Sequence, residues 1–502
     1  MSSLFSSFYT AMRGIQNSQA ELQTTGQNIS NVSTEGYTRQ RVDSYSLAPV
    51  GLGMRYAGNH AEPGQGVLSG GISQLRDIYL DIRYRSQNAK VGDMSAQLGT
   101  MNDIQNVIDE SKTSGLGDKI SDLVSALEKL SASPGDSVKE GSVMTSAELM
   151  TGIFNDYSEH LQTIWDQQLG NVKDDGVNQV NQLLSNIASL NDEIKISDIN
   201  GASALELKDS RNQLLDKLSQ YLNIEVSTKS VSVGSGINVE ELSVNFVGGD
   251  GSTYTLIDNN KCAKLSVTTD MTQSAPVSVN FTSIDGATTK MNDKISTGKM
   301  HSYLVMLNGS GAYDTSGAPD ASASGIPFYQ KSLNTFASKL ASTINALNSK
   351  DGSKPMFEAS DGSGTITAAN IRVAESWKNA TGSYLVNTAQ DLLSMIKGFS
   401  TDISFDTGSG KTVFNGTLQE FTDNLTNDLA LQLETVQNKN DTFGDTLSEI
   451  EKNRKSISSV DVSEEGINLI LYNQSLTASS RFMTTLDEAM DTIINKMGVV
   501  GR

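Results

Sequence analysis

Residues 4–32, LFSSFYTAMRGIQNSQAELQTTGQNISNV, repeat apolar side chains at intervals of seven. One series of the repeat is Phe8, Ile15, Leu22 and Ile29, and the second is Leu4, Ala11, Ser18, Thr25 and Val32. A sustained heptad repeat is typical of a coiled-coil helix, in which the two series form one apolar seam. Because the second series contains Ala, Ser and Thr, we expect a narrow seam and a helix that is marginal in water without a partner.

The C-terminal segment carries a matching repeat. Its main series is Val462, Leu469, Leu476, Met483, Met490 and Met497, with Tyr472, Leu486, Ile493 and Val500 at the companion positions. The economical interpretation is that the two terminal helices pack on each other, so that the middle of the chain forms outboard domains. The alternative is that they are unrelated amphipathic helices, each covering its own domain.

The composition favours a protein that contacts other proteins rather than nucleic acid or membrane. The net charge of the 502 residues is −20, whereas phosphate recognition needs clustered Lys and Arg. No apolar run is long enough to span a bilayer, and the N-terminus lacks the three regions of a secretory signal. We therefore expect no nucleic-acid partner, no membrane insertion and no cleavable signal peptide. The single cysteine, Cys262, excludes an intramolecular disulfide.

The middle of the chain changes period once. Helical patterns dominate to about residue 222, and from Ile224 apolar and polar residues alternate as in strands. The predicted fold class is mixed and mainly α, with paired terminal helices, a helix-rich second domain and an inserted β-rich outer domain. The predicted domains are residues 1–36 with 456–502, residues 37–223 with 326–455, and residues 224–325.

Motifs that resemble active sites fail on spacing. GSGKT at 408–412 lacks the first glycine of a phosphate-binding loop and fits a hairpin turn between two strands. Asp209, Arg211 and Asp216 are expected to form surface ion pairs along a helix rather than an acid–base site. The three histidines lie far apart and outside any zinc-binding pattern. We therefore predict no catalytic residue, no cofactor and no metal site.

Four stretches carry a family resemblance. Residues 26–43, GQNISNVSTEGYTRQRVD, resemble the Asn-x-x-Asn-x-x-Thr-x-Gly-Tyr signature of bacterial flagellar axial proteins of the rod, hook and hook-associated group. RDIYLDIRYRSQNA (76–89), LKDSRNQLLDKLSQYLNIEV (207–226) and the closing residues 458–498 are similar to members of the same group. The β insertion carries no resemblance that we can use.

The resemblance implies that the two terminal helices pair into an inner tube domain that stacks on identical neighbours. The implied self-assembly contacts are Leu4, Phe8, Ile15, Leu22 and Ile29 with Leu469, Leu476, Met483, Leu486 and Met490 across the seam. In the turn after the first helix, Gly36 would release the helix, while Asn28 and Asn31 would bond freed backbone groups. Tyr37, Arg39 and Arg41 would grip adjoining chains. An ordinary helix C-cap is the alternative explanation of Asn31 and Gly36.

The resemblance also implies a function and partners. Within the group, the GYTRQ motif and the long helical region favour an extracellular structural protein at the hook–filament junction, exported through the flagellar type III channel. Such a protein would join hook to filament and act as a platform for the distal hook-associated proteins. Its partners would be further copies of itself, the hook protein, a second junction protein, filament proteins and a dedicated export chaperone. The expected chaperone contacts are Met483, Met490 and Met497. The alternatives are a hook or rod protein of the same family, or an adhesion module carried by the β insertion.

Overall fold

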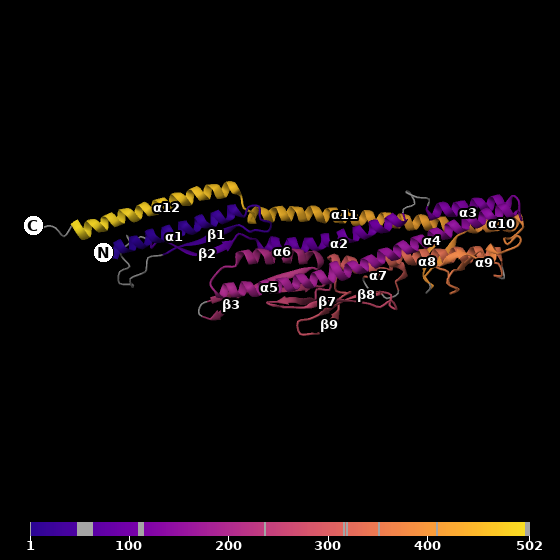
Figure 1. Ribbon diagram of the computed structural model, residues 1–502, viewed down its shortest axis with the longest axis horizontal. Coiled ribbons are helices and arrows are strands. Elements are labelled where there is room, and N and C mark those ends of the chain that lie inside the picture. The colour runs from indigo at the N-terminus through magenta and orange to yellow at the C-terminus, as the bar shows by residue number, and fades with distance from the viewer. Residues whose placement is uncertain are drawn as a thin grey trace, which may run out of the picture.

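The computed structural model describes residues 2–47, 64–108, 115–234, 237–314, 317, 320–349, 352–407 and 410–496. These residues form an elongated molecule with its main helices along the long axis (Figure 1). The two terminal helices lie together at one end, the helices α3 and α10 lie at the other, and the larger sheets lie along one side. The predicted fold class, mainly α with a β-rich insertion, is confirmed.

The terminal helices α1 (Ser2–Ser30) and α12 (Val462–Asp491) pack on each other, as predicted, and they run antiparallel. A π-helix, η3 (Thr492–Lys496), extends α12. Small residues lie between the two helices: Ser18 Oγ is 3.2 Å from Ser475 Oγ. A Cβ atom at Gly14 would lie only 2.8 Å from Ser479 Oγ, so glycine permits the two helices to approach closely there.

A β-hairpin lies along a second face of α1. Its strands are β1 (Gln40–Ser46) and β2 (Val67–Gln74), paired antiparallel. Ser44 donates a hydrogen bond to Asn17 Oδ1 at 2.8 Å, and Arg13 donates one to the carbonyl of Gln65 at 2.9 Å. This hairpin connects the coiled coil to the rest of the chain.

Three helices continue the rod beyond the hairpin: α2 (Ile78–Ile108), α6 (Leu205–Tyr221) and α11 (Leu418–Ser458). A capping box starts α11, since Thr417 accepts from the amide of Glu420 and the Glu420 carboxylate accepts from the amide of Thr417. Among the described residues, the buried apolar clusters and the side chains packed against them include nothing of α2 before Met94 and nothing of α11 after Val436. The contacts of the first turns of α2 with α6 and α11 include buried hydrogen bonds and ion pairs of Asp81, Arg85 and Asn88.

The main apolar core lies in the other half of the rod. Its helices are α3 (Leu116–Ser131), α4 (Ser137–Asn171), the π-helix η1 (Val172–Asn178), α5 (Gln179–Ile199), α7 (Lys299–Asn308), η2 (Gly311–Tyr313), α8 (Ile326–Asn348), α9 (Glu375–Lys378) and α10 (Ala389–Phe399). Two small hairpins complete it: β10 (Phe357–Ala359) with β11 (Ile371–Val373), and β12 (Ile403–Asp406) with β13 (Thr412–Gly416). Phe336, Phe405, Phe414 and Phe421 form an aromatic cluster, in which the Phe405 and Phe421 rings stack at 4.3 Å.

The β insertion begins at the predicted residue, Ile224. One antiparallel sheet has the order β3 (Ile224–Gly234), β4 (Ile237–Val247), β5 (Thr253–Asp258) and β6 (Lys261–Cys262). The other has the order β7 (Lys264–Thr269), β8 (Val277–Thr282) and β9 (Thr288–Lys290). The α5 helix packs against β4, so the insertion is fixed to the helical body. The division into three domains at the bounds given above stays a prediction.

Of the phosphate-loop resemblance at 408–412, residues 410 and 411 lie between β12 and β13, and Thr412 begins β13. Within it, residues 408 and 409 lie outside the described residues. No helix in the described part of the chain is long and apolar enough to cross a bilayer.

Candidate functional site

The turn after α1 is held by one buried side chain. Asn28 is 2% exposed, and its amide donates to the carbonyl of Gln40 at 2.9 Å and accepts from the Gln40 backbone N–H at 3.0 Å. The Tyr37 hydroxyl donates to the same Asn28 oxygen at 3.0 Å. Burial, with the nearby carboxylates, raises the pKa of Tyr37 to about 12, so Tyr37 remains a donor at neutral pH. Asn28 thus ties the end of α1 to the start of β1.

Gly36 and Asn31 play more local parts. Gly36 has a φ of 77°, and a Cβ atom there would lie 1.8 Å from Gln213 Nε2 on α6, so glycine is needed twice over. That Gln213 amide donates to the carbonyl of Glu35 at 2.6 Å. Asn31 bonds the carbonyl of Gln27, one helical turn back, which is the behaviour of a residue at a helix end.

A buried carboxylate on α6 forms hydrogen bonds to the turn. Asp209 is 5% exposed and accepts from Thr38, at 3.0 Å from the backbone N–H and at 2.6 Å from the hydroxyl. Burial raises the pKa of the Asp209 carboxyl, and the hydrogen bonds from Thr38 only partly oppose that rise.

The expectation that α6 carries surface ion pairs was wrong for Asp209 and Arg211. Arg211 is also buried, with its guanidinium bonded to Asn191 on α5 and to Glu240 on β4. The physical reason is that α6 is covered by the turn on one side and by α5 with the insertion on the other. Helical spacing alone could not indicate this double cover.

Arg39 connects the turn to the start of α12. Its guanidinium contacts Glu465 Oε1 at 2.7 Å and Glu464 Oε1 at 2.8 Å. The Arg39 backbone N–H donates to the carbonyl of Ser458 at 2.8 Å, where α11 ends. Arg41 is mostly exposed and lies 3.2 Å from Asp43 in its own chain. Contacts of Tyr37, Arg39 and Arg41 with adjoining chains stay a prediction.

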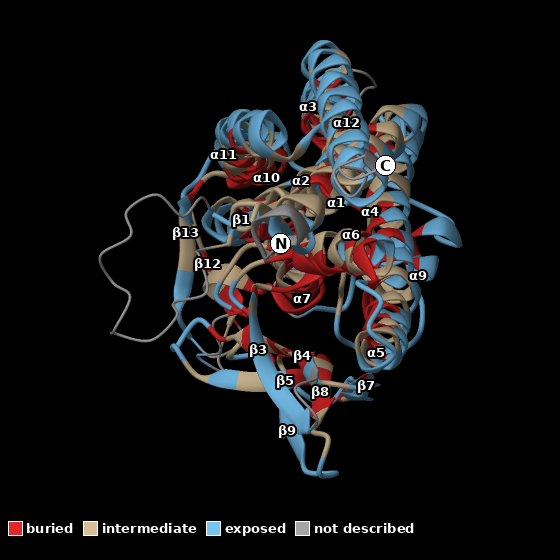
Figure 2. Cartoon of the chain, turned by 90° about the vertical axis from the view of Figure 1, so that its left-hand side faces the viewer, coloured by how far each residue is buried: buried red, intermediate tan, exposed pale blue. Residues whose placement is uncertain are grey.

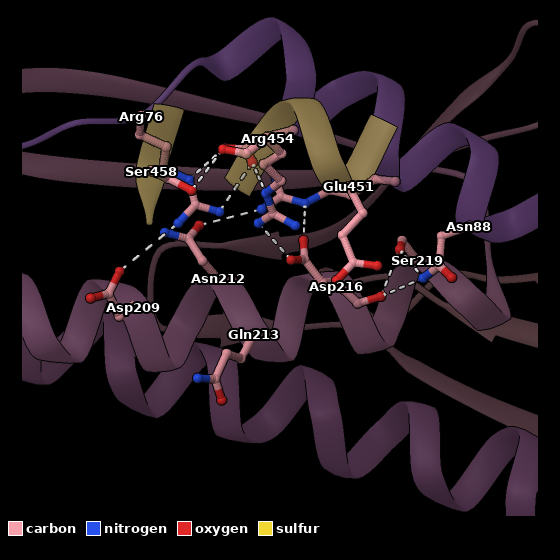
Figure 3. A network of polar contacts seen from close by, with 12 residues as sticks. Arg76, Asn88, Asp209, Asn212, Gln213, Asp216, Ser219, Glu451, Arg454 and Ser458 are labelled. Carbon is pink, nitrogen blue, oxygen red and sulfur yellow. Dashed lines mark hydrogen bonds and ion pairs between the residues drawn. The ribbon is translucent and has the colours of Figure 1, made fainter. Parts of the chain in front are cut away.

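An ion-pair network lies where the turn after α1 meets α2, α6 and α11 (Figure 3). We call this meeting point the joint. Arg454 on α11 contacts Asp81 Oδ1 on α2 and Asp216 Oδ2 on α6, each at 2.7 Å. Arg76 also contacts Asp81, at 2.5 Å, and Arg85 also contacts Asp216, at 2.9 Å. All five side chains are at least four-fifths buried. Arg454 therefore links all three helices of the rod at the point where the coiled coil joins it.

A cavity of about 680 Å³ opens beside this network. Its walls are residues 31–38 of the turn, the polar faces of α2 and α6, and the end of α11. Its lining includes amide side chains and oppositely charged side chains that form ion pairs with one another. Such a lining serves to connect the helices and the turn. Among the described residues, no group of three or more His, Cys, Asp or Glu side chains is placed to hold a metal ion.

The predicted seam residues lie where α1 and α12 meet. Phe8, Ile15, Leu22 and Ile29 are half-buried on α1, and Leu476, Met483, Leu486 and Met490 are half-buried on α12. Leu469 is 39% exposed. The side chain of Leu4 and the whole of Met497 lie outside the described residues. The α1 and α12 helices contact each other within one chain, and the part of these residues in self-assembly stays a prediction.

A second apolar face of α12 has no cover in the described structure. Ile467, Leu471 and Phe482 are 67%, 56% and 44% exposed. They lie on one side of α12, about 100° around the helix from the seam with α1. Figure 2 shows α12 largely in the colour of exposed residues. We call these three residues the free face of α12.

Substitution of Asn28 tests the turn. Asn28→Ala leaves the buried N–H and carbonyl of Gln40 without partners, so we expect a loss of about 2 kcal/mol in unfolding free energy. Asn31→Ala is the matched control, with an expected loss below about 1 kcal/mol, because that side chain is half-buried and the Gln27 carbonyl keeps a backbone donor. Urea denaturation of the full chain measures both. Equal losses for the two variants would contradict the role given to Asn28.

Comparisons with known proteins agree on one family. Residues 101–353 match the model of the flagellar hook-associated protein FlgK helical domain, and residues 8–38 match that of the flagella basal body rod protein. The first match includes the β insertion, where the sequence alone suggested no resemblance. The flagellar hook-associated protein 1 of Bacillus subtilis is 27% identical over the whole of both chains.

Two further relatives are more partial. The flagellar hook-associated protein 1 of Escherichia coli is 29% identical, over 46% of this chain and 40% of its own length. The solved structure of the flagellar hook junction protein FlgK from Burkholderia pseudomallei has a TM-score of 0.42 and 17% identity, covering 67% of this chain and 57% of its own.

Proposed function

Because the chain belongs to the flagellar hook-associated protein FlgK family, we infer that it is a structural protein of the bacterial flagellum that joins the hook to the filament. The observation that carries this function is the match of half the chain to the FlgK helical domain, together with full-length similarity to a flagellar hook-associated protein 1. The relatives named here are structural proteins of the flagellum.

The proposed role at the junction is that of an adaptor and an assembly platform. Pairing of the two chain ends places the coiled coil at one end of the rod and leaves the body and its β insertion to project from it. The coiled coil is suited to stacking, because its outer surface includes apolar side chains that no described residue covers, among them Tyr9 and the free face of α12. The proposed partners are further copies, the hook protein, a second junction protein and filament proteins.

A dedicated export chaperone is proposed to bind the C-terminal region. Met483 and Met490 are half-buried against α1 in the folded chain, so a chaperone that uses them must bind before α12 pairs with α1. This order suits export of an unfolded chain, in which the termini become ordered on assembly. The proposed location is the extracellular hook–filament junction.

Deletion of the gene tests the function. We expect cells with bare hooks by electron microscopy and with flagellin shed into the medium as monomer, because the filament would lack its attachment to the hook. Restoration of filaments by the gene on a plasmid is the control. Absence of hooks would move the protein to the rod or the hook, and intact filaments would overturn the junction role.

A further inference from the structure

Residues 200 and 201 form an Asn–Gly pair in the turn between α5 and α6. Such a pair is chemically labile, because the backbone nitrogen after an asparagine can attack the side-chain amide, and glycine has no Cβ to hinder the attack. The sequence contains three Asn–Gly pairs, and the other two begin at Asn308 and Asn415. The fold places the three pairs in different settings, so their reactivity should differ.

The first pair lies in an exposed turn. Asn200 and Gly201 are both exposed, and no hydrogen bond holds the Asn200 side chain within the described part of the chain. The turn is a Schellman motif: Gly201 has a φ of 77° and its N–H donates to the carbonyl of Asp198 at 3.1 Å. The N–H of Ala202 donates to the carbonyl of Ser197 at 3.1 Å. An exposed turn at a helix end opens at little cost in free energy, so ring closure is slowed there but not prevented.

The second pair is fixed in the core. Asn308 is fully buried, and its amide nitrogen donates to the carbonyl of Val277 at 2.8 Å and to Asp320 Oδ2 at 2.6 Å. Its amide oxygen accepts from the Val277 N–H at 2.9 Å. A Cβ atom at Gly309 would lie 2.5 Å from the carbonyl oxygen of Val305, so the backbone is tightly packed as well. The Asn308 side chain can reach the next backbone nitrogen only after these contacts open.

The third pair is held in a strand. Asn415 is exposed, but it lies in β13 opposite Ser404 of β12. The following residue, Gly416, is buried opposite Ile403. Ring closure requires rotation about the backbone of the asparagine, and here that rotation would disrupt the pairing of the two strands. The order of reactivity expected from the fold therefore places Asn200 first.

We propose that Asn200 is a site of spontaneous modification in the folded chain, by deamidation with water as the co-reactant. The Gly201 nitrogen attacks Cγ of Asn200, so a C–N bond forms, the Cγ–Nδ2 bond breaks, and the side-chain nitrogen leaves as ammonia with the proton from Gly201. Water then adds to either carbonyl of the cyclic imide and breaks the bond from that carbonyl to the imide nitrogen. The products are aspartate and isoaspartate. This inference does not depend on the proposed function, since the reaction needs only the chain and water.

Both products change the end of α5. Each places a new carboxylate at the C-terminal end of the helix, where negative charge is unfavourable. Isoaspartate also lengthens the backbone between residues 200 and 201, so it breaks the Schellman hydrogen bonds. The neighbouring Asp198 carboxylate accepts from the backbone N–H of Glu240 on β4 at 3.2 Å. We therefore expect isoaspartate at residue 200 to loosen the attachment of the β insertion to α5.

Peptide mapping of the purified full chain tests the site. The folded chain is incubated in mildly alkaline buffer and digested, and mass spectrometry follows the peptides of all three pairs in one sample. We expect Asn200 to react at least about tenfold faster than Asn308, because the contacts of Asn308 must open first and each 1.4 kcal/mol of opening free energy slows the reaction about tenfold. In concentrated urea the three pairs should react at similar rates, since the fold no longer distinguishes them.

The same digests give the contrary outcomes. Equal rates at Asn200 and Asn308 in the folded chain would overturn the proposal. It would also be overturned if Asn200 reacted in urea but not in the folded chain, or if Asn415 reacted faster than Asn200 in the folded chain.

Two variants test the consequence for the turn. Freshly purified Asn200→Asp carries the new charge on a normal backbone, so its hydrogen exchange at residues 201 and 202 should stay near that of the parent. The aged parent chain, enriched in isoaspartate, should exchange faster at these amides and at that of Glu240. Asn200→Gln is the control for the reaction, because its longer side chain closes a ring far less readily, and its exchange should not change on ageing. Unchanged exchange in the aged parent chain would contradict the loosening of the turn.

Discussion

Replacement of Arg454 by alanine is expected to lower the unfolding free energy by about 3 kcal/mol. Removal of one partner from a buried ion pair costs about 3–5 kcal/mol, because the remaining charge stays buried without its counterion. Here two carboxylates, those of Asp81 and Asp216, lose a contact of 2.7 Å each. Because each keeps another arginine, we expect the lower end of that range.

Lys455→Ala is the control for Arg454→Ala. Lys455 is the next residue, it is 68% exposed, and its partner Glu451 is also solvent-accessible. Exposed pairs at this helical spacing contribute about 0.3–0.5 kcal/mol. Urea denaturation of the two variants should therefore separate them clearly. In Arg454→Ala, hydrogen exchange should rise in residues 437–458 and not at the aromatic cluster. Equal losses of unfolding free energy in the two variants would contradict the contribution given to the network.

Replacement of Phe405 by alanine is expected to cost about 3–5 kcal/mol, through lost burial and the cavity left behind. Phe405 is fully buried, stacks on Phe421 and contacts the rings of Phe336 and Phe414. The control Phe482→Ala removes the same ring from an exposed face, so the unfolding free energy of the isolated chain should change by about 0.5 kcal/mol or less. If Phe405→Ala were as mild as Phe482→Ala, the cluster would not be a packed core.

The pattern of apolar residues predicted the elements well where the pattern was long. The heptads at both ends predicted that the terminal helices pair, and the change of period at Ile224 predicted the first strand of the insertion. The details of the seam were less accessible. Large side chains dominate the repeat, yet Gly14 and Ser18 also lie against α12, and their importance depends on the distance between the helices.

The polar joint could not be predicted from periodicity. Thr38 and Asp209 are 171 residues apart in the chain, and Arg454 is further still from Asp81. A charged residue on a helix is usually solvated, so helical spacing alone predicts a surface position for Asp81, Asp209 and Arg454. The available signal was the quoted stretch LKDSRNQLLDKL, whose resemblance to flagellar proteins marked it without indicating its contacts.

The pairing of the two ends of the chain has a consequence for quality control. Synthesis proceeds from the N-terminus, so α1 is made before its partner α12, which follows more than 400 residues later. A chain truncated by proteolysis or by premature termination lacks α12, and with it the counterparts of Ser18 and Arg39. Only a chain that contains both α1 and α12 can close the coiled coil, so the fold itself discriminates against copies that lack α12.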